Sequence, residues 1–155
     1  MQEDKIFINN FDNLILDFNS LTKILSKNNY ESVVKDKHLK NYIFESVFVV
    51  QNVQENKFFF NLTKKIIENF NIKNKKIDAF LFLSFSPGAF TPPHRDNYDI
   101  YLYGLYGETM YIVDDKKYLL KNNDLLFIEK NKTHQGISIT PRIVFSLGVR
   151  DDLNQ

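Results

Sequence analysis

Cysteine is absent from the 155-residue sequence, which excludes disulfides, thiolate metal sites and thiol catalysis together. Nitrogen and oxygen atoms are then the only expected metal ligands, and they favour hard or borderline metals. The sequence also lacks an excess charge of either sign, because 20 Lys and Arg residues oppose 19 Asp and Glu residues. No global field would draw the chain to nucleic acid or to an anionic membrane, so neither is a predicted partner.

Targeting signals are missing as well. The N-terminus has neither the basic start nor the apolar core of a signal peptide, and no apolar run approaches the ~20 residues that cross a bilayer. We therefore expect a cytoplasmic protein. A length of 155 residues corresponds to one domain, and 43% hydrophobic residues with fifteen Phe and eight Tyr predict a packed interior.

Glycine and proline are missing from the first half of the sequence, since all five glycines and four prolines lie between Pro87 and Gly148. Before that point, the apolar spacing over residues 14–25 and 59–70 predicts two amphipathic helices. Residues 42–53, rich in β-branched and aromatic side chains, predict a strand between them. We expect a single domain over residues 1–155, in which residues 1–76 support a barrel core formed by residues 77–150.

The second half is predicted to consist of short strands, because apolar runs alternate with turn signals. The expected strands are 79–85, 96–105, 109–113, 117–120, 125–128, 135–139 and 143–149. In the last of these, one face is wholly apolar and is expected to pack on the helices. The other face carries Arg142, Val144 and Ser146 and is expected to look into the barrel. The predicted fold is mainly β (α+β), a small sandwich or barrel.

Three residues form a candidate metal site. His94 and Asp96 are two residues apart, so on an extended strand both side chains leave the same face. His134 follows an apolar strand and a polar turn. Two imidazoles and one carboxylate leave open positions opposite them, which is the arrangement that non-haem Fe(II) needs to bind a co-substrate and oxygen together.

The spacing of these residues resembles the two cupin motifs. Gly88, five residues and then His94-x-Asp96 has the spacing of the first motif, with Asp in place of its second His. Asn123, five residues, Glu129-x-Asn131, two residues and His134 has the spacing of the second, where the family usually has Gly, Pro and Gly before the His. Asn tolerates the left-handed conformation expected at the two Gly positions. Residues 79–150 are thus similar to the double-stranded β-helix (cupin or jelly-roll barrel) of Fe(II)/2-oxoglutarate-dependent oxygenases.

This resemblance implies that His94, Asp96 and His134 carry catalytic Fe(II), and that a basic residue pairs with the far carboxylate of the co-substrate 2-oxoglutarate. Arg142, at the start of the final strand, matches the aspartyl/asparaginyl and prolyl hydroxylase-like branches, with Ser146 as the nearest hydroxyl. In the small Jumonji-like branch the basic residue would fall at Thr109, while Thr91 matches a hydroxyl near the co-substrate. Both branches stay open.

The function implied by the resemblance is that of a dioxygenase, a hydroxylase of an amino-acid side chain (free or in a peptide) or of a small molecule. Tyr98 and Tyr106 are expected to shape the substrate pocket. One alternative is a metal cupin that works without 2-oxoglutarate, as a dioxygenase or an isomerase. Another is a non-catalytic, ligand-binding cupin. An edge strand such as 42–53 also leaves a homodimer open.

Overall fold

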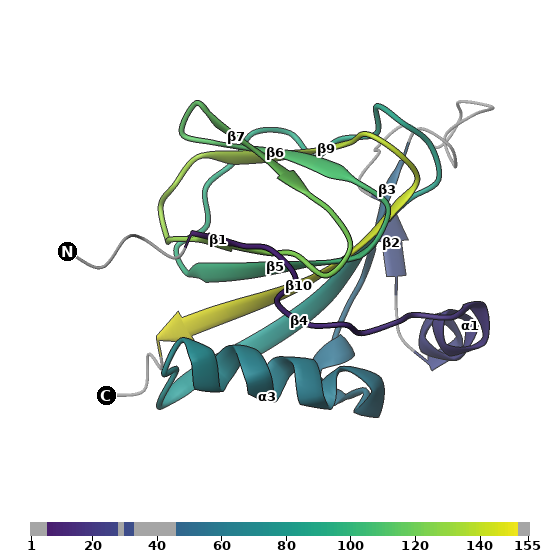
Figure 1. Cartoon of the computed structure of the whole chain (residues 1–155), viewed down its shortest axis with the longest axis horizontal. Helices are drawn as coiled ribbons and strands as arrows, with labels where there is room; N and C mark the ends of the chain where they lie inside the picture. The colour runs from purple at the N-terminus through teal and green to yellow at the C-terminus, as the bar shows by residue number, and fades with distance from the viewer. Residues whose placement is uncertain (1–5, 28–29, 33–45, 152–155) are drawn as a thin grey trace.

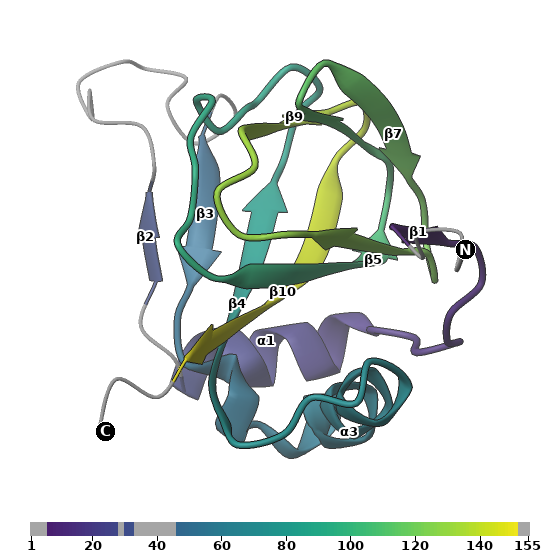
Figure 2. The same ribbon diagram turned by 90° about the vertical axis from the view of Figure 1, so that its left-hand side faces the viewer.

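The structure is a computed structural model that describes residues 6–27, 30–32 and 46–151. Two antiparallel sheets face each other (Figures 1 and 2). The larger has the order β1-β8-β5-β10-β4-β3-β2 and the smaller the order β7-β6-β9. The strands are β1 (Phe7–Ile8), β2 (Tyr30–Ser32), β3 (Val47–Val50), β4 (Lys75–Ser84), β5 (Asp99–Tyr106), β6 (Thr109–Val113), β7 (Lys116–Leu120), β8 (Leu125–Ile128), β9 (His134–Ser138) and β10 (Arg142–Asp151).

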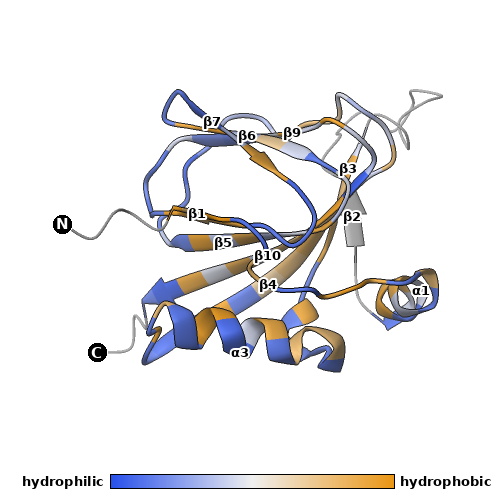
Figure 3. Ribbon diagram, in the orientation of Figure 1, coloured by the Kyte–Doolittle hydropathy of each residue, from blue (hydrophilic) through white to orange (hydrophobic). Residues whose placement is uncertain are grey.

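Helices α1 (Phe18–Lys27) and α3 (Phe60–Asn69) cover the outer face of the larger sheet (Figures 1 and 2). The carboxylate of Asp17 accepts a hydrogen bond of 2.7 Å from the amide of Ser20, so α1 begins where a side chain caps its free N–H groups. Two short 3-10 turns, η1 (Val53–Glu55) and η2 (Lys57–Phe59), lead into α3. Hydrophobic and hydrophilic residues alternate along α3 (Figure 3), as expected for a helix that packs on one side.

Strand β10 separates two apolar layers, as its alternation predicted. Phe145, Leu147 and Val149 face the helices and join a core with Phe59 and Ile66. On the opposite face Val144 belongs to a second core between the two sheets, together with Ile100, Leu102, Tyr111, Val113, Leu120, Leu126 and Ile128. The polar residues Arg142 and Ser146 are also buried on this inner face. The predicted barrel with helices packed on one sheet is therefore confirmed.

Two features of the first half differ from the sequence-based expectation. The strand expected over 42–53 is observed only as β3 (Val47–Val50), since 42–45 lie outside the described residues and Val53 begins the turn η1. In addition, β3 is not an edge strand, because β2 pairs with one side and β4 with the other. The predicted route to a homodimer through this strand is therefore wrong, since its backbone groups are already paired within the chain.

Two glycines with positive φ provide a test of the turn geometry. Gly107 (φ 71°) connects β5 to β6, and a Cβ there would lie 1.9 Å from the carbonyl oxygen of Pro141. Gly88 (φ 83°) would place its Cβ in open space. Both Ala variants acquire the left-handed penalty of about 1–2 kcal/mol. We expect Gly107→Ala to lose about 3 kcal/mol or more of unfolding free energy, because a backbone clash is added.

Urea denaturation of the two variants measures this difference. Gly88→Ala is the matched control because it shares the positive φ and lacks the clash. Equal losses of unfolding free energy in the two variants would contradict the close approach of the β5–β6 turn to Pro141.

Candidate metal centre

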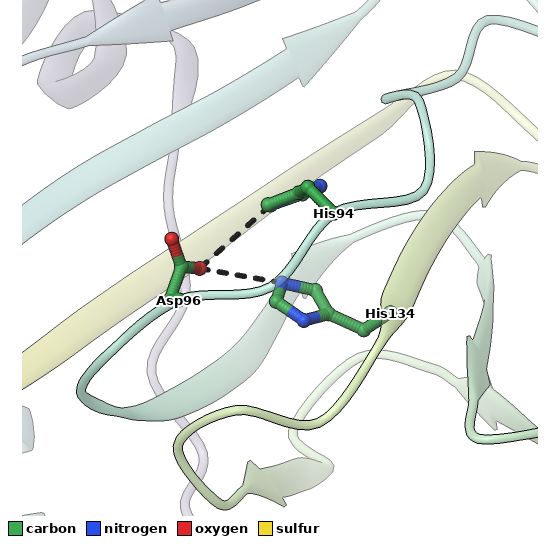
Figure 4. Close-up of side chains that lie close together, drawn as sticks. All are labelled: His94, Asp96 and His134. Carbon is green, nitrogen blue, oxygen red and sulfur yellow. Dashed lines mark ion pairs between the residues drawn. The ribbon is translucent and has the colours of Figure 1, made fainter.

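The two histidines are held opposite each other by backbone hydrogen bonds. His134 begins β9, and the amide of His94 donates to its carbonyl oxygen at 3.0 Å while the amide of His134 donates back at 2.9 Å. The carbonyl oxygen of Asp96 accepts a hydrogen bond of 2.7 Å from the amide of Asn131, in the turn before β9. The side chains of His94, Asp96 and His134 consequently point toward one another (Figure 4).

The turn residues behave as the motif spacing predicted. Asn123 and Asn131 occupy the two positions where cupins usually have Gly, and both are left-handed, with φ of 70° and 65°. The side-chain oxygen of Asn123 also accepts a hydrogen bond of 2.8 Å from the hydroxyl of Tyr103. Asn therefore provides the backbone conformation of Gly and, at Asn123, a further bond to the core.

The route by which Asp96 reaches the site differs from the prediction. His94 and Asp96 were expected on one extended strand, but β5 begins only at Asp99, and both residues lie in an irregular segment. Pro92 and Pro93 precede them and carry no N–H group, so they interrupt the pairing with β9, which is limited to isolated bridges at Phe90 and His94. The side chains converge where this segment runs beside β9, paired with it through the backbone of His94.

Hydrogen bonding at the imidazoles suits a metal site. Nδ1 of His94 lies 2.8 Å from the carbonyl oxygen of Pro92, and Nδ1 of His134 lies 3.1 Å from that of Lys132. A carbonyl oxygen only accepts, so each Nδ1 carries a proton, and in the neutral form of each ring Nε2 keeps a free lone pair. Both Nε2 atoms face the same carboxylate oxygen of Asp96, at 3.7 Å from His94 and 3.5 Å from His134.

These separations fit a shared ion. Ligand atoms about 2.1 Å from a common ion lie at most about 4.2 Å apart, and the two N···O distances of 3.7 and 3.5 Å fall below that limit. His134 is buried, Asp96 is partly buried and His94 is exposed, so the three donors lie at the boundary between the interior and solvent. Two imidazoles and one carboxylate form the donor set that suits Fe(II) while leaving other positions free.

The buried imidazole makes stability depend on pH. Burial is the main reason that the pKa of His134 lies below its ordinary value, and the neighbouring His94 lowers it further, against opposing contributions from the Lys132 carbonyl and Asp96. The unfolded chain then binds the proton more readily than the folded chain. Without metal, we expect the unfolding free energy contributed by this group to be constant well above the ordinary pKa of 6.5 and to fall as the pH decreases through that value.

Thermal unfolding of metal-free protein between about pH 8 and pH 5 measures this effect. His134→Asn is the matched variant, because it removes the titrating group. An equally steep loss of stability in His134→Asn would assign the effect to other groups.

One cavity joins the metal candidates to the predicted co-substrate residues. Its volume is about 180 Å³, and His94, Asp96 and His134 line it. Arg142, Thr91 and Ser146 line the same cavity, so the structure brings together all six residues singled out from the sequence. Tyr98 also lines it, as expected. Tyr106 does not, since it lies at the end of β5 and is 56% exposed, so its predicted place in the pocket is wrong.

Arg142 is a buried cation without a buried anion. Only 2% of it is exposed, and its hydrogen bonds go to the hydroxyls of Ser84 (3.3 Å), Thr109 (3.3 Å) and Tyr111 (3.4 Å). Within the described part of the chain, no carboxylate forms an ion pair with it. Burying a guanidinium beside neutral hydroxyls alone is unfavourable, so this arrangement suits an anion that enters the cavity.

The contact with Thr109 relates the two predicted branches. Thr109, on β6, has no positive charge with which to pair a carboxylate. Its hydroxyl accepts a hydrogen bond from the guanidinium of Arg142, which reaches this position from β10. The guanidinium of Arg142, from β10, therefore lies beside position 109, where the Jumonji-like branch would have its basic residue.

Sequence reasoning missed Tyr111 and Gly136. Tyr111 is buried, and desolvation is the main reason that its pKa is raised; it lines the cavity and contacts Arg142. The period-2 alternation from Thr109 could have placed Tyr111 on the inner face. Gly136 leaves room for both side chains, because a Cβ there would lie 2.8 Å from the Tyr111 ring and 3.3 Å from Nη1 of Arg142. No sequence signal marks that close approach.

Comparison with known proteins identifies the class of fold. Residues 81–146 match the family described as "Cupin domain", and the fold is the double-stranded β-helix implied by the motifs. None of the curated proteins matches the sequence. No helix in the described part of the chain combines the length and the apolar character needed to cross a membrane.

Among solved structures, the chain is similar to YcfD, a ribosomal oxygenase from Escherichia coli. Its complex with cobalt and succinic acid has a TM-score of 0.75 at 18% identity, covering 96% of this chain and 48% of that one. Its complex with cobalt and 2-oxoglutarate has a TM-score of 0.74 at 19% identity and the same coverage. The chain thus spans about half the length of YcfD, and the similarity concerns the fold.

Proposed function

We propose that the chain is an Fe(II)- and 2-oxoglutarate-dependent oxygenase that hydroxylates an amino-acid side chain or a small molecule. His94, Asp96 and His134 hold the metal, and Arg142 binds the distal carboxylate of 2-oxoglutarate. The observation that carries the proposal is the shared cavity, in which three converging metal donors and an unneutralised buried guanidinium face the same space. A dianion that chelates a metal with one end fits both requirements.

The residues around Arg142 suit recognition of a carboxylate. A planar guanidinium binds a carboxylate with two parallel hydrogen bonds, and its second terminal nitrogen donates to none of the described residues. The hydroxyls of Ser84, Thr109 and Tyr111 already orient the group, so little side-chain entropy is lost on binding. Thr91 and Ser146 provide further hydroxyls along the same cavity.

Bound Fe(II) would supply the redox chemistry, in which oxygen is reduced while 2-oxoglutarate loses CO₂ to give succinate and a substrate C–H becomes C–OH. The remaining work belongs to the chain. Arg142 orients the co-substrate, the two backbone carbonyls keep the histidine tautomers fixed, and the apolar lining from Val49, Phe80 and Phe82 limits water. YcfD, whose fold is similar, has been seen with cobalt and 2-oxoglutarate, which supports the proposal.

Anaerobic addition of Fe(II) and then 2-oxoglutarate tests the proposed function. We expect the visible charge-transfer absorption of the iron chelate to appear only when both are present, and to vanish in His94→Ala. Tight iron binding without the band would instead support a cupin enzyme that works without 2-oxoglutarate. No stoichiometric metal would support a non-catalytic ligand-binding cupin.

A further inference from the structure

We propose that Tyr98 is the specificity-determining side wall of the cavity beside the metal, and that Gly148 and Arg150 position its ring. The wall would admit a slender, uncharged group to the metal and exclude a wide one. This inference rests on the metal site proposed above and adds which substrates that site accepts.

The Tyr98 ring packs directly on the backbone of β10. Tyr98 lies two residues after Asp96 and lines the cavity together with Asp96 and Gly148. A Cβ on Gly148 would lie 2.9 Å from Cε2 and 3.2 Å from Cδ2 of the ring, so only glycine permits this contact. The ring therefore rests against the inner face of the sheet, and a larger residue at position 148 would displace it.

Arg150 holds the ring from a second direction. Its guanidinium carbon lies 4.2 Å from the ring centroid of Tyr98, within the range of a cation–π contact. Nε of Arg150 is in turn 3.0 Å from a carboxylate oxygen of Asp78 on β4, and Asp78 is the cross-strand partner of Gly148. Two adjacent strands of the larger sheet thus position one aromatic side chain next to a metal-ligand candidate.

The other side chains that line the cavity near Tyr98 are also mostly uncharged. Val49, Phe80 and Phe82, from β3 and β4, line the cavity with apolar side chains that are only partly buried. Within the described part of the chain, Asp96 is the only acidic residue in the lining, and the proposed metal uses it. A cationic group would find no free carboxylate there, whereas an uncharged group would contact carbon atoms on several sides.

Cobalt-loaded protein provides the test without requiring turnover. The visible absorption of bound Co(II) reports the binding of imidazole and of 4-phenylimidazole, which offer the metal the same nitrogen but differ in width. We expect the wild type to prefer imidazole, and Tyr98→Ala to reduce this preference about 10-fold or more. Tyr98→Phe should keep the preference, because the ring remains. Arg150→Ala should reduce it partly, and Gly148→Ala should increase it by moving the ring into the cavity.

Tyr118→Ala is the matched control, because it removes a tyrosine whose ring lies beside that of Phe7 and outside the lining of this cavity. An unchanged preference for imidazole in folded Tyr98→Ala would contradict the proposed role of Tyr98. If Tyr98→Ala fails to fold, Gly148→Ala and Arg150→Ala decide the question, and unchanged preference in both would overturn it equally. Absence of Co(II) binding in the wild type would contradict the metal site and, with it, the role of Tyr98. Co(II) binding with an unchanged preference in the variants would contradict only the role of Tyr98.

Discussion

Asp96→Asn is expected to weaken the binding of Fe(II) or Co(II) by more than about 100-fold, beyond the 10–100-fold that loss of a group supporting a metal ligand costs. The substitution keeps the shape of the side chain but removes the negative charge that both imidazoles face, at 3.5 and 3.7 Å. Isothermal titration with Co(II) under oxygen-free conditions measures the change.

Asp115→Asn is the control, since it makes the same chemical change at an exposed carboxylate in the turn between β6 and β7. Both variants should melt at the temperature of the metal-free wild type. If Asp96→Asn bound metal as tightly as Asp115→Asn, the carboxylate would not be a ligand.

Arg142→Met is expected to weaken 2-oxoglutarate binding by about 2–5 kcal/mol, roughly 30-fold to several thousand-fold, because a buried charge-assisted pair is lost. Iron affinity should stay unchanged, since Arg142 contacts hydroxyls and none of the three metal donors. The charge-transfer absorption of the chelate, titrated with 2-oxoglutarate, separates the two affinities.

The stability of the same variant gives a second, independent result. Met is an unbranched apolar residue without charge, and it removes the desolvation cost of a buried guanidinium that has no counter-ion. We therefore expect metal-free Arg142→Met to melt at the wild-type temperature or above. Arg95→Met is the control, because it removes the same charge from an exposed residue beside the site. A large loss of stability only in Arg142→Met would indicate a structural role for the guanidinium.

The sequence predicted which residues converge better than it predicted their local structure. The spacing of Gly88, His94 and Asp96, with His134 after its turn, was sufficient to propose which residues converge. It did not reveal that β5 begins only at Asp99, because where a strand begins depends on the neighbouring strands with which it pairs, here β8 and β10. The alternation of apolar and polar residues in β10 predicted which face of the strand looks inward, since successive side chains of a strand point to opposite faces.

What the sequence determined by itself was therefore the periodic and local information: strand faces, helix positions and turns that need a left-handed residue, as at Asn131. The tertiary structure alone decided which side chains share a space. Tyr111 beside Arg142, Tyr98 on Gly148 and the pairing of His94 with His134 depend on contacts between distant segments. Such contacts follow from packing of whole sheets, and no single segment encodes them.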